Sequence, residues 1–518
     1  MSTRFKIPTL VFAAFAAALF GVQADTPPKK EAPQVDAKKD APPQDEDITK
    51  TVADWGTDKF AGPPTEFRKG NVTVRELDAK ALTKTGSGYT IKLPSGAPIT
   101  TPTVHDGRVY VSGGFHSKEF YCFEASSGKL VWAINLDDDG PSSAVVEDGV
   151  CVFNTESCTI FGVDAQTGKL LWSHWLGDPL TSTPTISNGK VFTSYPAGGR
   201  GRAEPAKGAK DRPPCSHVLA CLELKTGKIL WQRWLESDVM SAPVAADKEL
   251  YVTSFAGVVY KFQQEDGKLL SAVRSRATSA PVVVGNQVYL TRRADDGKGK
   301  AEEQIAGVGR DDGKTNVEGT KKEAGYIDST VQGRTALTEA AKALDASNGF
   351  AGGAPATANA DAGLFNIGQG SVSTLQSFQG SRLLNFADRN FNTMGDEVMC
   401  SDPKTGKCLW SFKLEGDLKK HGGFMGAPPA AADGQVFLAT LSGDVLQMDP
   451  ETGKVTKTYK VGSQVRQQPA IVDGKIFVGT QDGKLVVIDT GDKKFTGWTT
   501  WGGNSAHSGV VAPPAKAK

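Results

Sequence analysis

Short runs in which apolar and polar residues alternate fill most of this chain, a spacing typical of half-buried β-strands. The segment "TPTVHDGRVYVSG" (102–114) places one such run on each side of Asp106-Gly107. Asp-Gly and Asn-Gly favour a two-residue hairpin turn, because both turn positions adopt positive φ. Related hairpins are predicted at 143–154, 182–195, 241–255 and 279–292, in a degenerate form near 376–386, and at 426–440 and 467–480.

A second pattern alternates with the first. The stretches "ASSGKLVW", "AQTGKLLW", "LKTGKILW" and "PKTGKCLW" each place a glycine turn before a short strand that contains tryptophan. Weaker copies surround Gly267, Gly313, Gly453 and Gly491. The turn glycines and tryptophans of the four clear copies are Gly128, Trp132, Gly168, Trp172, Gly227, Trp231, Gly406 and Trp410. Each repeat of roughly 40 residues therefore predicts four antiparallel strands.

Eight such quartets predict an all-β fold, an eight-bladed β-propeller whose small antiparallel sheets pack face to face around a central channel. A β-sandwich has turns at similar spacing, but its strands do not recur as quartets with one shared ending. The repeat tryptophans occupy one equivalent site on the outer strand, where a large flat side chain would be buried against the neighbouring blade. We interpret them as packing residues.

The N-terminal residues carry signals for export. Residues 1–24 combine a basic start, an apolar run and small residues ending at Ala24, which are the features of a secretory signal peptide. A membrane anchor is the alternative, but the run is short and Pro8 interrupts its start. The composition then predicts a disordered linker at 25–50, a segment leading into the propeller at 51–96, the propeller at 97–510 and a tail at 511–518. We expect a soluble, monomeric mature chain without a membrane span, in the periplasm or secreted.

Two insertions interrupt the repeats, at about 196–217 and 317–370, and the second includes a short predicted helix at 335–347. Strand direction places the Asp-Gly and Thr-Gly-Lys turns at one face of the ring and both insertions at the other. Loops on a rigid scaffold often carry function, so this elaborated face is the predicted partner site. Its basic residues could meet an acidic partner or could form only a solvated rim: Arg200, Arg202, Lys210, Arg212, Lys419 and Lys420.

The charge balance and the reactive side chains argue against nucleic-acid binding, metal binding and catalysis. The 59 basic residues nearly balance 58 acidic ones, so no net field favours nucleic acid. The six histidines lack the close paired spacing of metal ligands, and no nucleophile elbow or phosphate-binding loop occurs. We therefore predict no catalytic residue and no metal site.

The cysteines leave two pairings open. Cys151 and Cys158 flank one turn and Cys400 and Cys408 flank another, so each pair could form a cross-strand disulfide in an oxidising compartment. The total of seven cysteines leaves at least one thiol unpaired within the chain.

The repeats resemble a known family. "YCFEASSGKLVW" (121–132) and "FGVDAQTGKLLW" (161–172) are similar to the pyrroloquinoline quinone (PQQ) repeat, and "GWTTWGGNSAHSGV" (497–510) resembles a segment frequent in such chains. The resemblance covers about residues 97–510. It implies a β-propeller, used either by quinoprotein dehydrogenases that hold PQQ and calcium at the channel or by the outer-membrane assembly lipoprotein as a scaffold for other proteins.

This sequence departs from both patterns. It has no adjacent cysteines like those that stack on the quinone, no matching set of calcium ligands, and no cysteine at the cleavage site for a lipid. We expect a non-catalytic extracytoplasmic propeller that binds or scaffolds another envelope or secreted protein and needs no cofactor. The alternative is a PQQ-dependent quinoprotein-type oxidoreductase, with PQQ and calcium.

Overall fold

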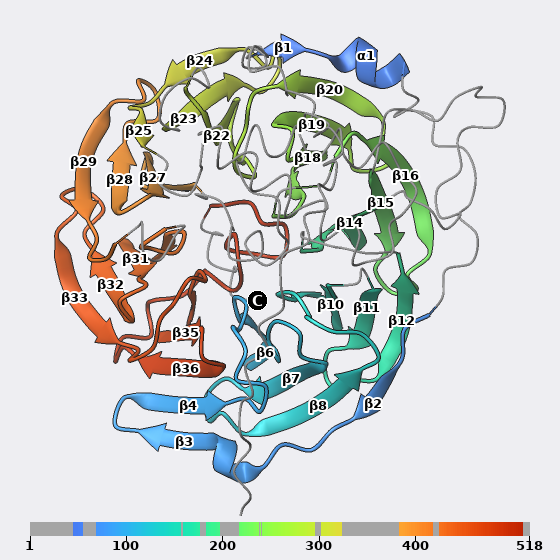
Figure 1. The fold of residues 1–518 in the computed structure, drawn as a ribbon, viewed down its shortest axis with the longest axis vertical. Helices are drawn as coiled ribbons and strands as arrows, with labels where there is room; N and C mark the ends of the chain where they lie inside the picture. The colour runs from blue at the N-terminus through green and yellow to red at the C-terminus, as the bar shows by residue number, and fades with distance from the viewer. Residues whose placement is uncertain are drawn as a thin grey trace, which may run out of the picture. The chain divides into compact units, whose positions relative to one another are not determined.

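The computed structural model confirms the predicted eight-bladed β-propeller (Figure 1). It describes residues 45–54, 69–156, 159–176, 183–196, 217–237, 239, 241–295, 302–323, 383–417 and 424–510. Within these residues, eight separate antiparallel sheets of four or five strands stand around one centre. Each sheet is one blade, and blades are numbered here in chain order from the sheet that contains Thr103.

The first four blades follow the predicted quartets. Their strands are, in blade 1, β5 (Thr103–His105), β6 (Arg108–Ser112), β7 (Glu119–Glu124) and β8 (Leu130–Leu136); in blade 2, β9 (Val145–Glu147), β10 (Val150–Asn154), β11 (Thr159–Asp164) and β12 (Leu170–Trp175); in blade 3, β13 (Thr185–Ser187), β14 (Lys190–Pro196), β15 (His217–Glu223) and β16 (Ile229–Leu235); and in blade 4, β17 (Val244–Ala246), β18 (Glu249–Thr253), β19 (Val258–Gln263) and β20 (Leu269–Arg274).

The remaining blades complete the ring. Their strands are, in blade 5, β21 (Val282–Val284), β22 (Gln287–Arg293), β23 (Glu302–Gly309), β24 (Thr315–Glu318) and β25 (Lys322–Glu323); in blade 6, β26 (Leu384–Phe386), β27 (Arg389–Met394), β28 (Glu397–Ser401) and β29 (Cys408–Lys413); in blade 7, β30 (Ala430–Ala432), β31 (Gln435–Ala439), β32 (Asp444–Met448) and β33 (Val455–Lys460); and in blade 8, β34 (Ala470–Val472), β35 (Lys475–Gly479) and β36 (Lys484–Asp489).

Blade 8 takes its fourth strand from the N-terminal segment. β4 (Gly88–Lys92) pairs antiparallel with β36, and β3 (Leu82–Thr85) pairs with β4 on the outside. The repeat at Gly491 predicts a further strand after the turn, but that place in the sheet is already filled. Residues 51–96 therefore do more than lead into the propeller, since they supply the strands that close it.

The segment before β3 lies along the outer edges of other blades. β1 (Glu46–Asp47) extends blade 4 beside β20, and β2 (Val72–Val74) extends blade 1 beside β8. Helix α1 (Thr49–Asp54) inserts Val52 into the core beside blades 3 and 4, and a 3₁₀ turn (Ala79–Ala81) precedes β3. Residues 46–50 of the predicted linker are thus ordered elements, whereas residues 25–44 lie outside the described part of the chain.

Packing between blades builds the core. Separate clusters of buried side chains join adjacent blades, such as the one that contains Val145 of blade 2 and Val191 of blade 3. Another joins Tyr251 of blade 4 to Leu290 of blade 5. The flat, apolar strand faces therefore hold the ring together, as expected when each small sheet cannot bury its faces alone.

Most hairpin turns follow the sequence pattern. Asp106 and Gly107 have φ of 47° and 70°, the left-handed values that the two-residue turn requires. Blade 6 differs, because its hairpin spans 384–394 and its turn consists of Ala387 and Asp388, at 51° and 53°. The degenerate copy expected near 376–386 is therefore displaced along the chain, since these two residues take the place of Asp-Gly.

Candidate functional site

The predicted partner residues Arg200, Arg202, Lys210, Arg212, Lys419 and Lys420 all lie outside the described residues. The strands that flank the first insertion are described, and Pro196 of β14 lies opposite His217 of β15. The insertion thus leaves and re-enters one blade at neighbouring points. The second insertion begins within β24 and continues past β25, and its predicted helix at 335–347 lies outside the described part of the chain.

The repeat residues form one recurring contact between blades. The indole N–H groups of Trp132, Trp172 and Trp231 donate to backbone carbonyls of the following blade at 3.1, 2.8 and 3.1 Å. Trp410 makes the same bond to Pro450, at 3.0 Å. Each acceptor lies three residues before the turn glycine of that blade. The repeat therefore encodes a blade-to-blade joint and not a reactive site.

The joint also explains one of the turn glycines. A Cβ built on Gly227 would lie 2.5 Å from a ring carbon of Trp172, and this residue has φ of 68°. Both the backbone conformation and the indole above it therefore exclude a side chain.

The sequence interpretation missed the residue that completes this series. Tyr89 of β4 covers Gly128 of blade 1, and its hydroxyl donates to the Ala125 carbonyl at 3.0 Å. Tyr89 thus occupies the tryptophan position at the point where the ring closes. The sequence signal was present, because "TGSGYTIK" (85–92) has a glycine turn before an alternating strand.

The described cysteines are free thiols. Cys400 is buried opposite Trp410, whereas Cys408 lies opposite Ser401, because the pairing of β28 with β29 shifts by one residue between Cys400 and Ser401. Burial raises the pKa of the Cys400 thiol to about 12. The structure thus lacks the disulfide between Cys400 and Cys408 that the spacing allowed. Cys151 is also free, and Cys158 lies outside the described residues.

The C-terminal segment 498–510 joins the inner strands of several blades. The backbone N–H groups of Val104, Ile186 and Ala245 donate to Thr499, Ser505 and Ala506 at 2.7, 2.8 and 3.0 Å. These three strands belong to blades 1, 3 and 4, and a bridge between Ile471 and Trp498 adds blade 8. The segment that resembled the family pattern is therefore a crosslink at the centre of the ring.

His507 anchors this segment. Its side chain is buried, with Nδ1 2.6 Å from the Trp501 carbonyl oxygen and Nε2 2.9 Å from that of Pro184. Its ring lies beside that of Trp501, with centroids 4.4 Å apart. A carbonyl oxygen only accepts, so the neutral ring, which has one N–H, donates to one of these two oxygens. The buried ring lies between Pro184 and the C-terminal segment, which gives this histidine a structural role.

Acidic side chains in the connections between blades accept hydrogen bonds from the following blade. Asp138 follows β8 and accepts hydrogen bonds from Thr155 and Thr159 of blade 2. Glu236 follows β16 and accepts from Ser254 and Tyr260 of blade 4. Burial raises the pKa of Glu236, which favours its protonated form. These carboxyl groups fix neighbouring blades at the elaborated face.

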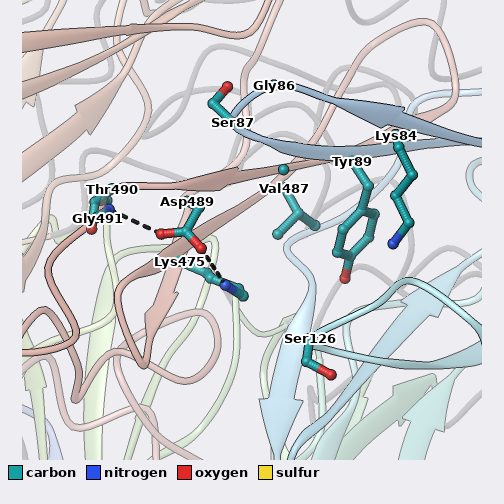
Figure 2. A pocket seen from close by; sticks show the side chains of 11 residues that line it. Lys84, Gly86, Ser87, Tyr89, Ser126, Lys475, Val487, Asp489, Thr490 and Gly491 are labelled. Atoms are coloured by element: carbon teal, nitrogen blue, oxygen red, sulfur yellow. Dashed lines mark hydrogen bonds and ion pairs between the residues drawn. The ribbon is translucent and has the colours of Figure 1, made fainter.

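A small cavity of about 400 Å³ lies where the ring closes (Figure 2). Lys475 donates to Asp489 at 2.7 Å, and this bond helps to lower the pKa of the carboxyl group. Lys84 donates to the Ser127 carbonyl and lies 5.2 Å from the Tyr89 ring centroid. The charged groups of the cavity are therefore already partnered. Its lining consists of Lys84, Gly86, Ser87, Gly88, Tyr89, Ser126, Lys475, Val487, Asp489, Thr490 and Gly491.

The described residues contain no group of three or more His, Cys, Asp or Glu side chains placed to hold a metal ion. Their five cysteines lie in five different strands, so none stacks as an adjacent pair. The expectation that no cofactor binds remains a prediction. In the same part of the chain, no helix is long and apolar enough to cross a membrane.

A family comparison agrees with this architecture. The model of a family described as "Outer membrane protein assembly factor BamB" matches residues 70–209, 216–391 and 394–516. The chain belongs to this family. The resemblance to PQQ-repeat propellers, and to the assembly factor among them, is thereby confirmed.

Individual relatives are distant. The assembly factor BamB of Nitrosomonas eutropha is 21% identical over 214 residues, which cover 37% of this chain and 47% of the relative. BamB of Moranella endobia is 22% identical, covering 37% and 48%. The quinoprotein alcohol dehydrogenase PedH of Pseudomonas putida is 28% identical over 111 residues, covering 19% and 18%. The chain thus matches about half the length of these BamB relatives or less.

Solved structures share the fold. BamB from Moraxella catarrhalis has a TM-score of 0.50 at 16% identity and covers 78% of this chain and 97% of its own. The computationally designed Ika8 protein has a TM-score of 0.52 at 15% identity and covers 76% and 96%. A designed protein matches as well as a natural one, so this likeness bears on the architecture alone.

Proposed function

We propose that this chain is a non-catalytic, extracytoplasmic scaffold that binds other proteins and takes part in the assembly of outer membrane proteins. Membership of the BamB family supports this role. The observation that carries the proposal is the family match over most of the chain. The C-terminal segment 498–510, which bonds to the inner strands of blades 1, 3, 4 and 8, supports a rigid ring as the scaffold.

The location follows from the N-terminal sequence. We propose that the signal peptide is cleaved after Ala24 and that the mature chain starts at Asp25 in the periplasm or outside the cell. An intact mass that retains residues 1–24 would contradict this part of the proposal. The partner site is proposed to lie at the elaborated face, with Arg202, Lys210 and Lys419 among its basic residues.

A loop replacement tests the partner site. Because Pro196 lies opposite His217, a short Gly-Ser turn can replace residues 197–216 without moving either strand. Closure entropy changes only slowly with loop length, so the free energy of unfolding should stay within about 1–2 kcal/mol. Photo-crosslinkers at Lys210 and Lys419 should capture outer-membrane assembly proteins in the native envelope. One at Lys407, on the turn face, is the control.

The outcome separates three cases. Loss of the Lys419 crosslink in the folded loop-replaced chain supports the elaborated face. Unchanged capture at Lys419 would remove the first insertion from the site, and capture of the same partners at Lys407 would move the site to the turn face. If the purified chain instead binds PQQ with calcium and oxidises an alcohol through an artificial dye, the non-catalytic role is wrong.

A further inference from the structure

The interface between blades 5 and 6 is built differently from its neighbours. Counted from the turn glycine, the tryptophan position of blade 5 holds Val317. The cluster of described apolar side chains at this interface has four buried members, and the cluster between blades 4 and 5 has eleven. On its other side, blade 6 shares one large apolar cluster with blades 7 and 8. The four members at the interface between blades 5 and 6 are Val282, Tyr289, Ile305 and Leu383.

Blade 6 turns polar side chains toward blade 5. Phe391 of β27 packs in the cluster shared with blade 7, so its sequence neighbours Asn390 and Asn392 point to the opposite side. Both asparagines are buried, at 1% and 0% exposure. Counted from the hairpin turn, the position of Asn392 holds Leu290 in blade 5 and Leu438 in blade 7. An amide thus replaces a leucine at an internal position of the ring.

The amide of Asn392 is not satisfied. Neither its Oδ1 nor its Nδ2 has a hydrogen-bond partner in the part of the chain that the structure describes, and the same holds for the Ser401 hydroxyl. Ser401 lies opposite Asn390 in the sheet, so it faces the same interface, and it is 3% exposed. A buried polar group without a partner destabilises the closed arrangement, because it has given up its hydrogen bonds to water.

Blade 5 presents charged groups to the same interface. Tyr289 faces blade 6, since its hydroxyl donates to the Pro403 carbonyl at 3.1 Å. Arg293 on the same strand and Glu303 opposite it therefore point toward blade 6 as well. Arg293 donates to both carboxylate oxygens of Asp295, at 2.6 and 2.7 Å, and Glu303 is 0% exposed. Separation of the two blades would return these groups to water, which offsets part of its cost.

The terminal segments hold this interface at few points. The N-terminal segment adds β1, β2 and β4 to blades 4, 1 and 8, and within the described residues it adds no strand to blade 6. The C-terminal segment contacts blade 6 where the N–H of Asn385 donates to the Gly509 carbonyl at 3.2 Å. An ion pair of 2.9 Å between Lys322 and Glu397 also joins blades 5 and 6.

We propose that the ring opens at the interface between blades 5 and 6, which separates and recloses while the other interfaces stay packed. Opening hydrates the Asn392 amide and the Ser401 hydroxyl, so it costs less free energy here than where apolar faces would meet water. The chain between β25 of blade 5 and β26 of blade 6 is attached to both sides, so opening changes the distance between its ends. This motion does not depend on the proposed scaffold function.

Buried methionines report the opening in the unmodified chain. Met394 and Met399 lie on the side of blade 6 that faces blade 5 and are 4% and 3% exposed. Met425 and Met448 belong to the cluster of blades 6 to 8 and are 0% exposed. Hydrogen peroxide oxidises an accessible thioether to the sulfoxide. Peptide mass spectrometry at early times should show Met394 and Met399 oxidised at least about tenfold faster than Met425 and Met448.

Substitutions at equivalent positions separate opening from static exposure. Asn392→Leu introduces the residue found in blades 5 and 7, and it should slow the oxidation of Met399 by about threefold or more while Met448 keeps its rate. Leu438→Asn is the matched reverse exchange between blades 6 and 7, and it should accelerate the oxidation of Met448. Unfolding curves identify the variants that remain folded under the labelling conditions.

Three results would overturn the proposal. The first is equal oxidation of Met399 and Met448 in the unmodified chain. The second is unchanged or faster oxidation of Met399 in folded Asn392→Leu, because ordered water would then satisfy the amide and hold the blades together. If Asn392→Leu does not fold, Ser401→Val removes the other unpartnered group, and an unchanged rate at Met399 in that variant is the third.

Discussion

The indole N–H of Trp172 in blade 2 donates a hydrogen bond of 2.8 Å to the backbone carbonyl of Leu224 in blade 3. The same ring covers Gly227, three residues after the acceptor. One side chain thus packs against a turn and also satisfies a buried carbonyl of the next blade. The neighbouring joints repeat this arrangement. Each contact is therefore formed by the tryptophan of one blade and the turn glycine of the next blade.

Replacing the glycine tests the contact from the turn side. Gly227→Ala should destabilise the chain more than Gly189→Ala, although both residues have φ near 70°. The positive φ costs either alanine about 1–2 kcal/mol. Only Gly227 places the new Cβ against an indole, which adds about 1–3 kcal/mol of overpacking. Urea unfolding measures both, and equal losses would show that the indole can move aside.

Replacing the tryptophan tests the other side. Trp172→Phe should cost about 1–3 kcal/mol, because it leaves the Leu224 carbonyl without its donor. Trp172→Ala should cost about 3–5 kcal/mol. The neighbouring Leu171 is 45% exposed, so Leu171→Ala should stay within about 0.5 kcal/mol. A melting temperature unaffected by Trp172→Ala would contradict the joint.

Two truncations test ring closure. A chain that starts at Leu77 loses β1, α1 and β2 but keeps β4, and it should still melt in one transition at a lower temperature. A chain that starts at Pro94 also loses β4, which leaves β36 and the face of Gly128 uncovered. We expect it to aggregate or to show fast amide exchange in blade 8. Similar melting of the two chains would show that β4 is dispensable.

Removing the C-terminal crosslink should loosen the centre of the ring. Without residues 498–518, the N–H groups of Val104, Ile186 and Ala245 lose their acceptors. Their amide exchange should accelerate together, although the three residues belong to different blades. Deletion of 511–518 alone serves as the control and should leave these amides protected.

Acid should weaken one set of turns. Hydrogen bonds from Thr167 lower the pKa of Asp164, and hydrogen bonds from Thr405 and Thr452 lower the pKa values of Asp402 and Asp449. A carboxyl group whose pKa is lower in the folded state stabilises the fold above its unfolded pKa of about 3.9. That stability is lost as pH falls through the folded pKa. Asp164→Asn should therefore reduce the fall in melting temperature below pH 4, and an unchanged pH profile would contradict this role.

The candidate site was less accessible to sequence reasoning than the fold. Composition identified the basic loops near Arg200 and Lys419, but these residues lie outside the described part of the chain, so their grouping stays a prediction.

The number of blades and the position of nearly every hairpin follow from local sequence patterns. Turns such as Asp106-Gly107 depend on the φ preferences of adjacent residues, and the tryptophan repeat marks equivalent strands. Tertiary structure decided that β4 completes blade 8 and that residues 498–510 cross the centre. It also left Cys400 and Cys408 as separate thiols. The physical reason is that hairpins are fixed by neighbours in the chain, whereas ring closure pairs Lys92 with Lys484 and needs the whole propeller to bring them together.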